Sequence, residues 1–247
     1  MQPDNQDTKS GVETKVSSVL SWSMLAVVTV AFIIFLQKIL LKAIPGLVGS
    51  DQKSLISQLC FLVFASLAMI LLNRTKRFDF GFRRPAQFPW LAIVLGGLIP
   101  GALGSAGVIA LGGSGLGDMS SAPSLLFFIT LFLIAPLCEE VLLRGLAQGL
   151  MTPISNAGIS IGKLRFSVPV IISGLMFSAM HLSLRTSGVG WNTVLPILAF
   201  TFALGIIAGY QREKSGSLLS AITVHIFGNI GGVLGGMIIM SLMFMYG

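Results

Sequence analysis

Long apolar runs, separated by short polar connections, fill almost the whole chain and constrain its fold more than any other feature. A helix needs about 20 apolar residues to cross a membrane, and these runs are continuous rather than alternating, which favours helices over strands. The sequence contains eight candidate stretches, at residues 18–44, 54–73, 90–113, 122–151, 167–184, 193–211, 216–229 and 231–246. We therefore predict an all-α fold, a polytopic membrane helical bundle with about eight transmembrane helices.

The composition agrees with this fold and bounds the domains. Of the 247 residues, 54% are hydrophobic and 10% are charged, and the mean hydropathy is +0.89, which places the chain among multi-span membrane proteins. We expect residues 1–17 to form a polar cytoplasmic tail and residues 18–246 to form a single transmembrane domain. Gly228, Gly231 and Gly232 mark either a turn between the last two stretches or a bend within one long helix.

The basic residues sort by connection and predict the orientation in the membrane. The net charge of +7 invites a nucleic-acid partner, but cytoplasmic connections of membrane proteins carry an excess of Lys and Arg. A cytoplasmic amino terminus places on the inner side Lys9, Lys15, Arg74, Lys76, Arg77, Arg83, Arg84, Lys163, Arg165, Arg212 and Lys214, and on the outer side only Lys38, Lys42, Lys53 and Arg185. We therefore expect membrane lipids and no nucleic acid as partners, with the basic and aromatic segment 74–84 on the anionic leaflet. The short chain and compact connections favour a bacterial plasma membrane.

Two adjacent carboxylates lie inside the apolar stretch 122–151, and they are the strongest functional signal in the chain. Of nine acidic residues, all but Glu139 and Glu140 fall in tails or connections. A carboxylate at membrane depth costs roughly 2.5–3.5 kcal/mol on insertion scales, so such residues usually have a function. Arg144 follows Glu140 at the helical spacing of four, which predicts an ion pair. Glu139 is then left without a cation and is suited to act as a general base on water.

The two histidines of the chain lie at a matching depth. Glu139 is 12 residues from Met151 and His181 is 14 residues from Ser167, so both are roughly 18–21 Å from those helix ends. His225, with Asn229 four residues later, lies at a similar depth in its own stretch. A histidine and an asparagine on one helix face are able to donate two hydrogen bonds to an oxyanion, while the other histidine shares a water molecule with the glutamate.

Two further residues belong to this pattern. Phe177 precedes His181 by four positions and is expected beside it on the helix. Pro136 lies three residues before Glu139 and lacks a backbone N–H, so we expect it to bend the helix at the site.

Together these residues form three spaced motifs: Glu139-Glu140-x-x-x-Arg144, Phe177-x-x-x-His181 and His225-x-x-x-Asn229. In this order they resemble the motifs of the CAAX protease and bacteriocin-processing family of intramembrane proteases, also called Abi, with a motif core at residues 122–232. The resemblance implies an endopeptidase that cuts peptide bonds within or near the membrane. It also implies that Glu139 and His181 activate water, that His225 and Asn229 stabilise the oxyanion, and that Glu140 and Arg144 organise the helix.

Three alternatives accompany this interpretation. One carboxylate and two histidines also form the ligand set of catalytic zinc sites, so if zinc is bound its ligands are Glu139, His181 and His225. The sequence has no HExxH pair, and we predict no firm cofactor, with zinc as the alternative. Intramembrane charges also occur in ion- or proton-coupled transporters, and the same fold also suits a non-catalytic immunity or scaffold protein. As a protease, the chain is expected to act on a membrane-associated peptide or a lipidated protein substrate. The resemblance implies this, because the family's substrates include prenyl proteins, pheromones and bacteriocins.

Overall fold

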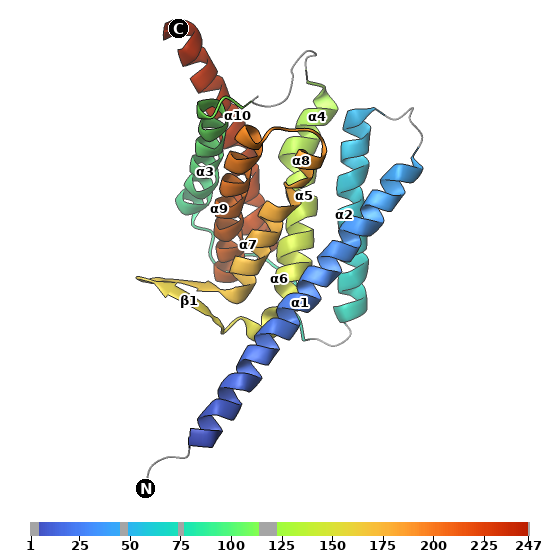
Figure 1. Ribbon diagram of the computed structural model, residues 1–247, viewed down its shortest axis with the longest axis vertical. Helices are drawn as coiled ribbons and strands as arrows, with labels where there is room; N and C mark the ends of the chain where they lie inside the picture. Colours follow the sequence, from blue (N-terminus) through green and yellow to red (C-terminus); the bar gives the residue numbers. More distant parts are fainter. Residues whose placement is uncertain (1–4, 45–48, 74–76, 114–122, 247) are drawn as a thin grey trace.

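A computed structural model of the protein describes residues 5–44, 49–73, 77–113 and 123–246, which form a bundle of long helices with one small hairpin (Figure 1). Within these ranges, seven helices are long and apolar enough to cross a membrane. Six of the seven are the helices α1 (Asn5–Ala43), α2 (Ser50–Leu72), α3 (Trp90–Ala110), α7 (Val168–Met180, extended by the short α8, Ser183–Thr186), α9 (Trp191–Ser215) and α10 (Leu218–Tyr246). The polar segment predicted as a tail at residues 1–17 is helical from Asn5 onward, and the apolar part of α1 begins at Lys15.

The seventh membrane-length segment, Leu125–Leu150, changes its winding along its length. It consists of α4 (Leu125–Ile129), the π-helical η2 (Thr130–Ile134), α5 (Ala135–Glu140), the π-helical η3 (Val141–Ala147) and α6 (Gln148–Leu150). The interruption expected from Pro136 therefore takes the form of a wide π-helical turn directly before α5. Such turns inside α-helices are frequent at functional sites.

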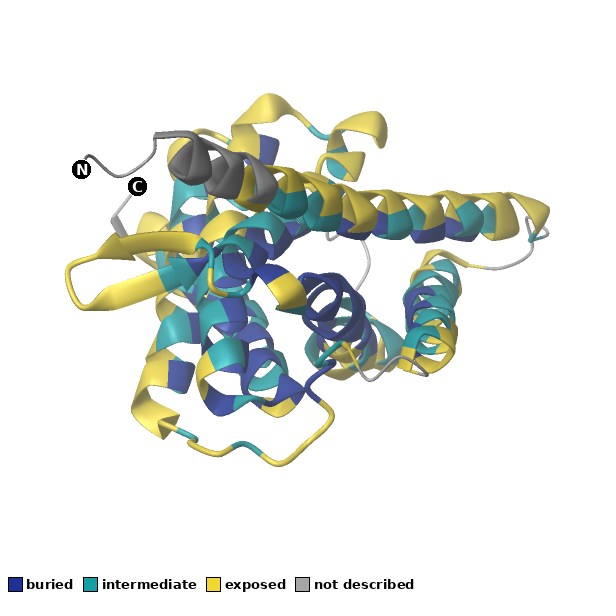
Figure 2. Ribbon diagram, turned by 90° about the horizontal axis from the view of Figure 1, so that it is seen from below, coloured by how far each residue is buried: buried dark blue, intermediate teal, exposed yellow. Residues whose placement is uncertain are grey.

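This segment is the centre of the bundle. Its pieces contact α1, α2, α7 and α10, and every residue from Glu140 to Met151 is buried. Viewed along the bundle, the buried residues gather in the middle while the outer faces of the helices are exposed (Figure 2). A helix that is covered on all sides is the place where a polar group of a membrane protein can be shielded from lipid.

Helices α3 and α10 pack against each other through glycines, as is common in membrane bundles. A Cβ atom on Gly97 or Gly101 would overlap the backbone of α10 at Val224 and Gly228, and a Cβ on Gly231 would overlap Leu98 of α3. Ser105 adds a hydrogen bond from its Oγ to the Gly232 carbonyl, at 2.6 Å. The absence of side chains thus lets the two backbones touch.

The final two candidate stretches form one helix rather than two, so the structure has seven membrane-length helices instead of the predicted eight. Gly228, Gly231 and Gly232 lie inside α10, where a Cβ atom on Gly228 would overlap Leu204 of α9 and a Cβ atom on Gly231 would overlap Leu98 of α3. Of the two alternatives left by the sequence, the single long helix is the one observed.

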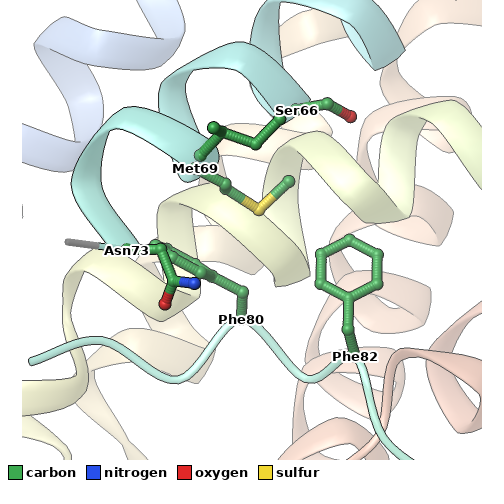
Figure 3. Close-up of a pocket in the computed structure, with 6 residues that line it drawn as sticks. Ser66, Met69, Asn73, Phe80 and Phe82 are labelled. Atoms are coloured by element: carbon green, nitrogen blue, oxygen red, sulfur yellow. The ribbon is translucent and has the colours of Figure 1, made fainter. Parts of the chain in front are cut away.

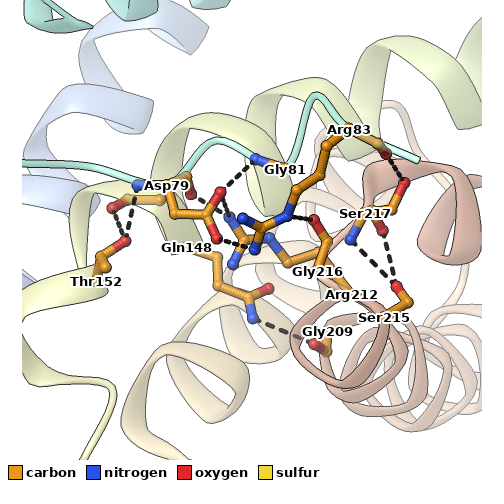
Figure 4. A network of polar contacts seen from close by, with 11 residues as sticks. Asp79, Gly81, Arg83, Gln148, Thr152, Gly209, Arg212, Ser215, Gly216 and Ser217 are labelled. Atoms are coloured by element: carbon orange, nitrogen blue, oxygen red, sulfur yellow. Dashed lines mark hydrogen bonds and ion pairs between the residues drawn. The ribbon is translucent and has the colours of Figure 1, made fainter. Parts of the chain in front are cut away.

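The connection between α2 and α3 folds back under the bundle and is held there by polar contacts (Figure 4). Asp79 forms an ion pair with Arg83, with 2.8 Å between Oδ2 and Nη2, and its backbone carbonyl accepts a hydrogen bond from Arg212 of α9. Arg83 also donates from Nε to the carbonyl of Gly216, at 2.7 Å. Phe80 in the same connection is buried. Residues 79–83 of the basic and aromatic segment therefore bind to the end of α9 and to the turn that follows it.

The remaining elements connect the central segment to α7. A short 3-10 turn, η4 (Thr152–Ile154), is followed by the antiparallel hairpin β1 (Gly158–Ile161) and β2 (Leu164–Ser167). Helix α7 starts directly after β2, where the Ser167 hydroxyl caps its first turn by accepting a hydrogen bond from Val170 N.

Replacement of Gly101 tests the packing of α3 on α10. We expect Gly101→Ala to lower the free energy of unfolding by about 1–3 kcal/mol, because the added methyl group overlaps the Gly228 carbonyl. The matched control is Gly236→Ala, whose methyl group would lie 3.9 Å from Ser105 and should be neutral or stabilising. Denaturant titration in detergent micelles measures both; equal stability of the two variants would contradict this packing.

Candidate active site

A buried ion pair forms the core of the candidate site. Arg144 Nη1 lies 2.9 Å from Glu140 Oε1, and both side chains have no exposed surface. The same carboxylate oxygen lies 2.9 Å from Nδ1 of His225, which comes from α10. The expected ion pair between Glu140 and Arg144 is therefore present, and it extends to a second helix, α10, that the sequence did not connect with it.

Arg144 also holds α9 and α7 in place. Its Nη2 donates a hydrogen bond to the carbonyl of Gly205 in α9, at 2.9 Å, and its guanidinium lies over the ring of Phe177 in α7, 4.9 Å from the centroid. A Cβ atom on Gly205 would lie 3.1 Å from Arg144 Nη2 and 2.9 Å from Gly174 Cα. Glycine at this position thus permits the close approach of all three helices.

Gln148 repeats this contact one turn further along. It follows Arg144 by four residues, and its Nε2 donates to the carbonyl of Gly209 at 3.1 Å (Figure 4). Gly209 in turn follows Gly205 by four residues on α9. The two donors and the two glycine carbonyls form a short ladder that aligns the central segment with α9.

Glu139 has a different environment from its neighbour. Its side chain is 13% exposed, and its Oε2 lies 3.9 Å from Nε2 of His225. Among the residues that the structure describes, no lysine or arginine lies within ion-pair distance of this carboxylate. Gln58 of α2 donates a hydrogen bond from Nε2 to Glu139 Oε1, at 2.8 Å. Gln58 was not predicted to belong to the site, although a glutamine within an apolar span is a usable signal.

His225 lies between the two glutamates. A carboxylate only accepts hydrogen bonds, so the nitrogen next to Glu140, Nδ1, carries a proton. The ring is thereby fixed with its other nitrogen, Nε2, directed at Glu139. A separation of 3.9 Å is too long for a direct hydrogen bond, but one oxygen atom is able to lie within hydrogen-bond distance of both groups.

Phe177 connects the remaining histidine to this cluster. Its ring packs edge to face against His181, with 5.1 Å between centroids, and also against His225, with 5.0 Å. His181 follows the last residue of α7, and its Nδ1 lies 2.9 Å from the Phe177 carbonyl, so this nitrogen carries the proton. The predicted proximity of Phe177 and His181 is therefore observed, and Phe177 is shared by both histidines.

Asn229 is held by the π-helical turn of the central segment. Its Nδ2 donates to the carbonyl of Leu131 at 2.7 Å. That carbonyl has lost its helical partners, because Ala135 N–H donates to Thr130 O instead and the next residue, Pro136, has no N–H. The proline therefore creates the acceptor that positions Asn229, and one of the two amide hydrogens is used in this bond.

The predicted zinc ligands do not form a metal site in this arrangement. Within the described ranges, no three His, Cys, Asp or Glu side chains come close enough together to hold a metal ion. The hydrogen bonds of His225 and His181 through Nδ1 leave Nε2 available on each ring, so the distance between the side chains decides the question. The residues present do not fit the zinc alternative.

A pocket at the end of α2 lies apart from these residues (Figure 3). It is lined by Ser66, Met69, Ile70, Asn73, Phe80 and Phe82. Met69 lies 11 residues after Gln58 on the same helix, a distance of about 16 Å along the axis. The pocket therefore does not contain the glutamates and histidines.

Comparison with known proteins identifies the helices that carry the cluster. The family described as type II CAAX prenyl endopeptidase, Rce1-like, matches residues 121–231. This part of the chain, which carries the cluster, matches the CAAX protease family. The match covers all the motif residues, from Glu139 to Asn229, whereas Gln58 lies outside it. No curated protein and no solved structure was found to match the chain. This match and the seven apolar helices of the described residues make this an integral membrane protein.

Substitution of each glutamate by glutamine separates their environments. Glu140→Gln leaves the buried Arg144 without an anion, so we expect it to lower the free energy of unfolding by about 3–5 kcal/mol. Glu139→Gln is the matched control, since Glu139 is partly exposed and has no arginine or lysine partner among the described residues. This variant should lose less than about 1 kcal/mol of unfolding free energy. Unfolding in mixed micelles measures the stability of both variants. Similar losses of stability would show that the two glutamates do not have different environments.

Proposed function

We propose that the protein is an intramembrane endopeptidase that hydrolyses a peptide bond of a membrane-associated or lipidated substrate with water activated by Glu139. One observation carries this proposal: Glu139 is the partly exposed carboxylate of the cluster, and Nε2 of His225 faces its Oε2 at 3.9 Å. A carboxylate without a cationic partner is free to accept a proton from water. The family match supports hydrolysis over the transport alternative.

In this mechanism Glu139 acts first as a general base and then as a general acid. It removes a proton from water while the water oxygen forms a bond to the carbonyl carbon of the substrate, which produces a tetrahedral oxyanion. The protonated Glu139 then gives the proton to the leaving nitrogen as the C–N bond breaks, and a carboxylic acid and an amine are released. Gln58 keeps the carboxylate in one orientation through its hydrogen bond to Oε1.

The two histidines and Asn229 complete the site. His181 has its Nδ1–H on the Phe177 carbonyl, so its Nε2 is available to accept a hydrogen bond from the attacking water. Asn229 faces the developing oxyanion from α10 with its second amide hydrogen as a donor, and His225 adds a donor at Nε2 in its doubly protonated form. Fixed donors of this kind are worth about 10²–10³ in rate for each donor.

The substrate class and the orientation form the second part of the proposal. The description of the matching family names prenyl substrates, and we infer a lipidated or membrane-associated peptide as the substrate, with bacteriocin or pheromone precursors as the other candidates. The amino terminus faces the cytoplasm of a bacterial plasma membrane, because the end of the bundle with Lys163, Arg165, Arg212 and Lys214 is the more basic end. With seven spans, the carboxyl terminus lies on the other side.

The decisive test of this function is peptide cleavage by Glu139→Gln. We expect kcat to fall by about 10²–10⁴, the contribution typical of a general base, while the unfolding midpoint stays at the wild-type value. Glutamine keeps an oxygen that accepts the hydrogen bond from Gln58, so the geometry of the site is preserved. The assay uses the protein in vesicles with prenylated and unprenylated fluorogenic peptides under single-turnover conditions.

The control is Asp51→Asn, which removes a carboxylate from the first turn of α2 outside the cluster. It should cleave at the wild-type rate. Cleavage by Glu139→Gln at the rate of this control would disprove the role of Glu139. A preference for the prenylated peptide supports a lipidated substrate, and faster cleavage of the unprenylated peptide contradicts it.

A further inference from the structure

The hairpin of β1 and β2 has one apolar and one polar face. Its register pairs Ile159 with Phe166 and Ile161 with Leu164, and residues paired across two antiparallel strands point to the same side of the sheet. The other side carries the pairs Gly158 with Ser167 and Ser160 with Arg165. All four large apolar side chains of the hairpin therefore share one face.

This apolar face is not covered by the bundle. The exposed fractions are 54% for Ile159, 63% for Ile161 and 48% for Leu164. An isolated two-stranded hairpin is marginally stable in water, so a face of this kind needs an apolar surface to lie on. In Figure 1 the hairpin points sideways, across the direction of the long helices, at the end of the bundle where α9 ends. In Figure 2 it extends to one side, clear of the bundle.

Contacts at the base of the hairpin give the direction of each face. Phe166, on the apolar face, packs against Tyr210 of α9 with 5.7 Å between ring centroids. Ser167, on the polar face, donates a hydrogen bond to Glu213 Oε1 at 2.6 Å. Tyr210 precedes Glu213 by three residues, so it lies about 4.5 Å further from the end of α9 at Ser215, toward the middle of the membrane. The apolar face is therefore turned toward the membrane.

The charges around the hairpin fit an anionic lipid surface. Lys163 lies in the turn at its tip and is exposed, and Arg165 is exposed on β2. Lys214 lies over the ring of Tyr210, 5.8 Å from the centroid. Aromatic rings with neighbouring cations are typical of the boundary between lipid tails and headgroups, and each basic residue near an anionic leaflet adds attraction.

We propose that the hairpin Gly158–Ser167 is a lipid-binding anchor that lies in the membrane interface with its apolar face among the lipid chains and with Lys163 and Arg165 at anionic headgroups. In the proposed orientation this is the cytoplasmic leaflet. Helix α7 begins directly after the hairpin, carries Phe177 and ends directly before His181, so the anchor also fixes the depth of these residues. The anchor itself does not depend on peptidase activity.

Fluorescent labels on opposite faces of the hairpin test this proposal. We would label Ile161→Cys and, as the matched control on the polar face, Ser160→Cys with an environment-sensitive dye, in full-length protein with Cys60 and Cys138 replaced by Ala. The vesicles contain phosphatidylcholine with or without phosphatidylglycerol. We expect a blue-shifted emission at position 161 and several-fold stronger quenching by spin-labelled lipid than at position 160, where aqueous iodide should quench instead.

Charge dependence gives an independent readout. Quenching by lipid at position 161 should increase with phosphatidylglycerol, and the double substitution Lys163→Gln with Arg165→Gln should remove this increase while the unfolding midpoint stays unchanged. Equal iodide quenching at both positions would overturn the proposal. Shielding of the label at position 161 from both quenchers would also overturn the proposal, since the apolar face would then be covered by protein.

Discussion

The ion pair between Glu140 and Arg144 is the interaction on which the rest of the structure depends. Both groups are fully buried, and a charge taken out of water is tolerated only when it is paired and hydrogen-bonded. The pair meets most of this condition through contacts with His225 of α10, Gly205 of α9 and the ring of Phe177 in α7. Among the described residues, Glu140 Oε2 and Arg144 Nε have no hydrogen-bond partner. The contacts of this buried pair thus connect the central segment with α7, α9 and α10.

The same pair explains how two adjacent glutamates acquire different roles. Glu140 forms a buried ion pair with Arg144. Glu139 instead accepts a hydrogen bond from the amide of Gln58 and faces Nε2 of His225. His225 is fixed by Glu140 and directed at Glu139, so the buried carboxylate orients a side chain toward the carboxylate that we propose as the general base. The wide turn before Pro136 serves the same end, since it frees the Leu131 carbonyl that holds Asn229.

Much of this site follows from the sequence, because its signals are local. The spacing of four between Glu140 and Arg144, and between Phe177 and His181, determines which side chains meet on one helix. Contacts between helices are not encoded by spacing: neither the hydrogen bond from Gln58 nor the bond between His225 and Glu140 was predicted. Gly228, Gly231 and Gly232 left both a turn and a single long helix open, because glycines that permit close packing look the same in sequence as glycines that permit a turn.

The central claim is that Glu140 and Arg144 act as one coupled unit, and a double-mutant cycle on unfolding tests it most directly. The cycle compares Glu140→Gln, Arg144→Met and the double variant in micelles. The account predicts that the double variant loses less stability than the sum of the single losses, by about 0.5–3 kcal/mol, because removing both charges leaves neither one buried alone. Additive losses would contradict it, since they would mean that the two charges are satisfied independently.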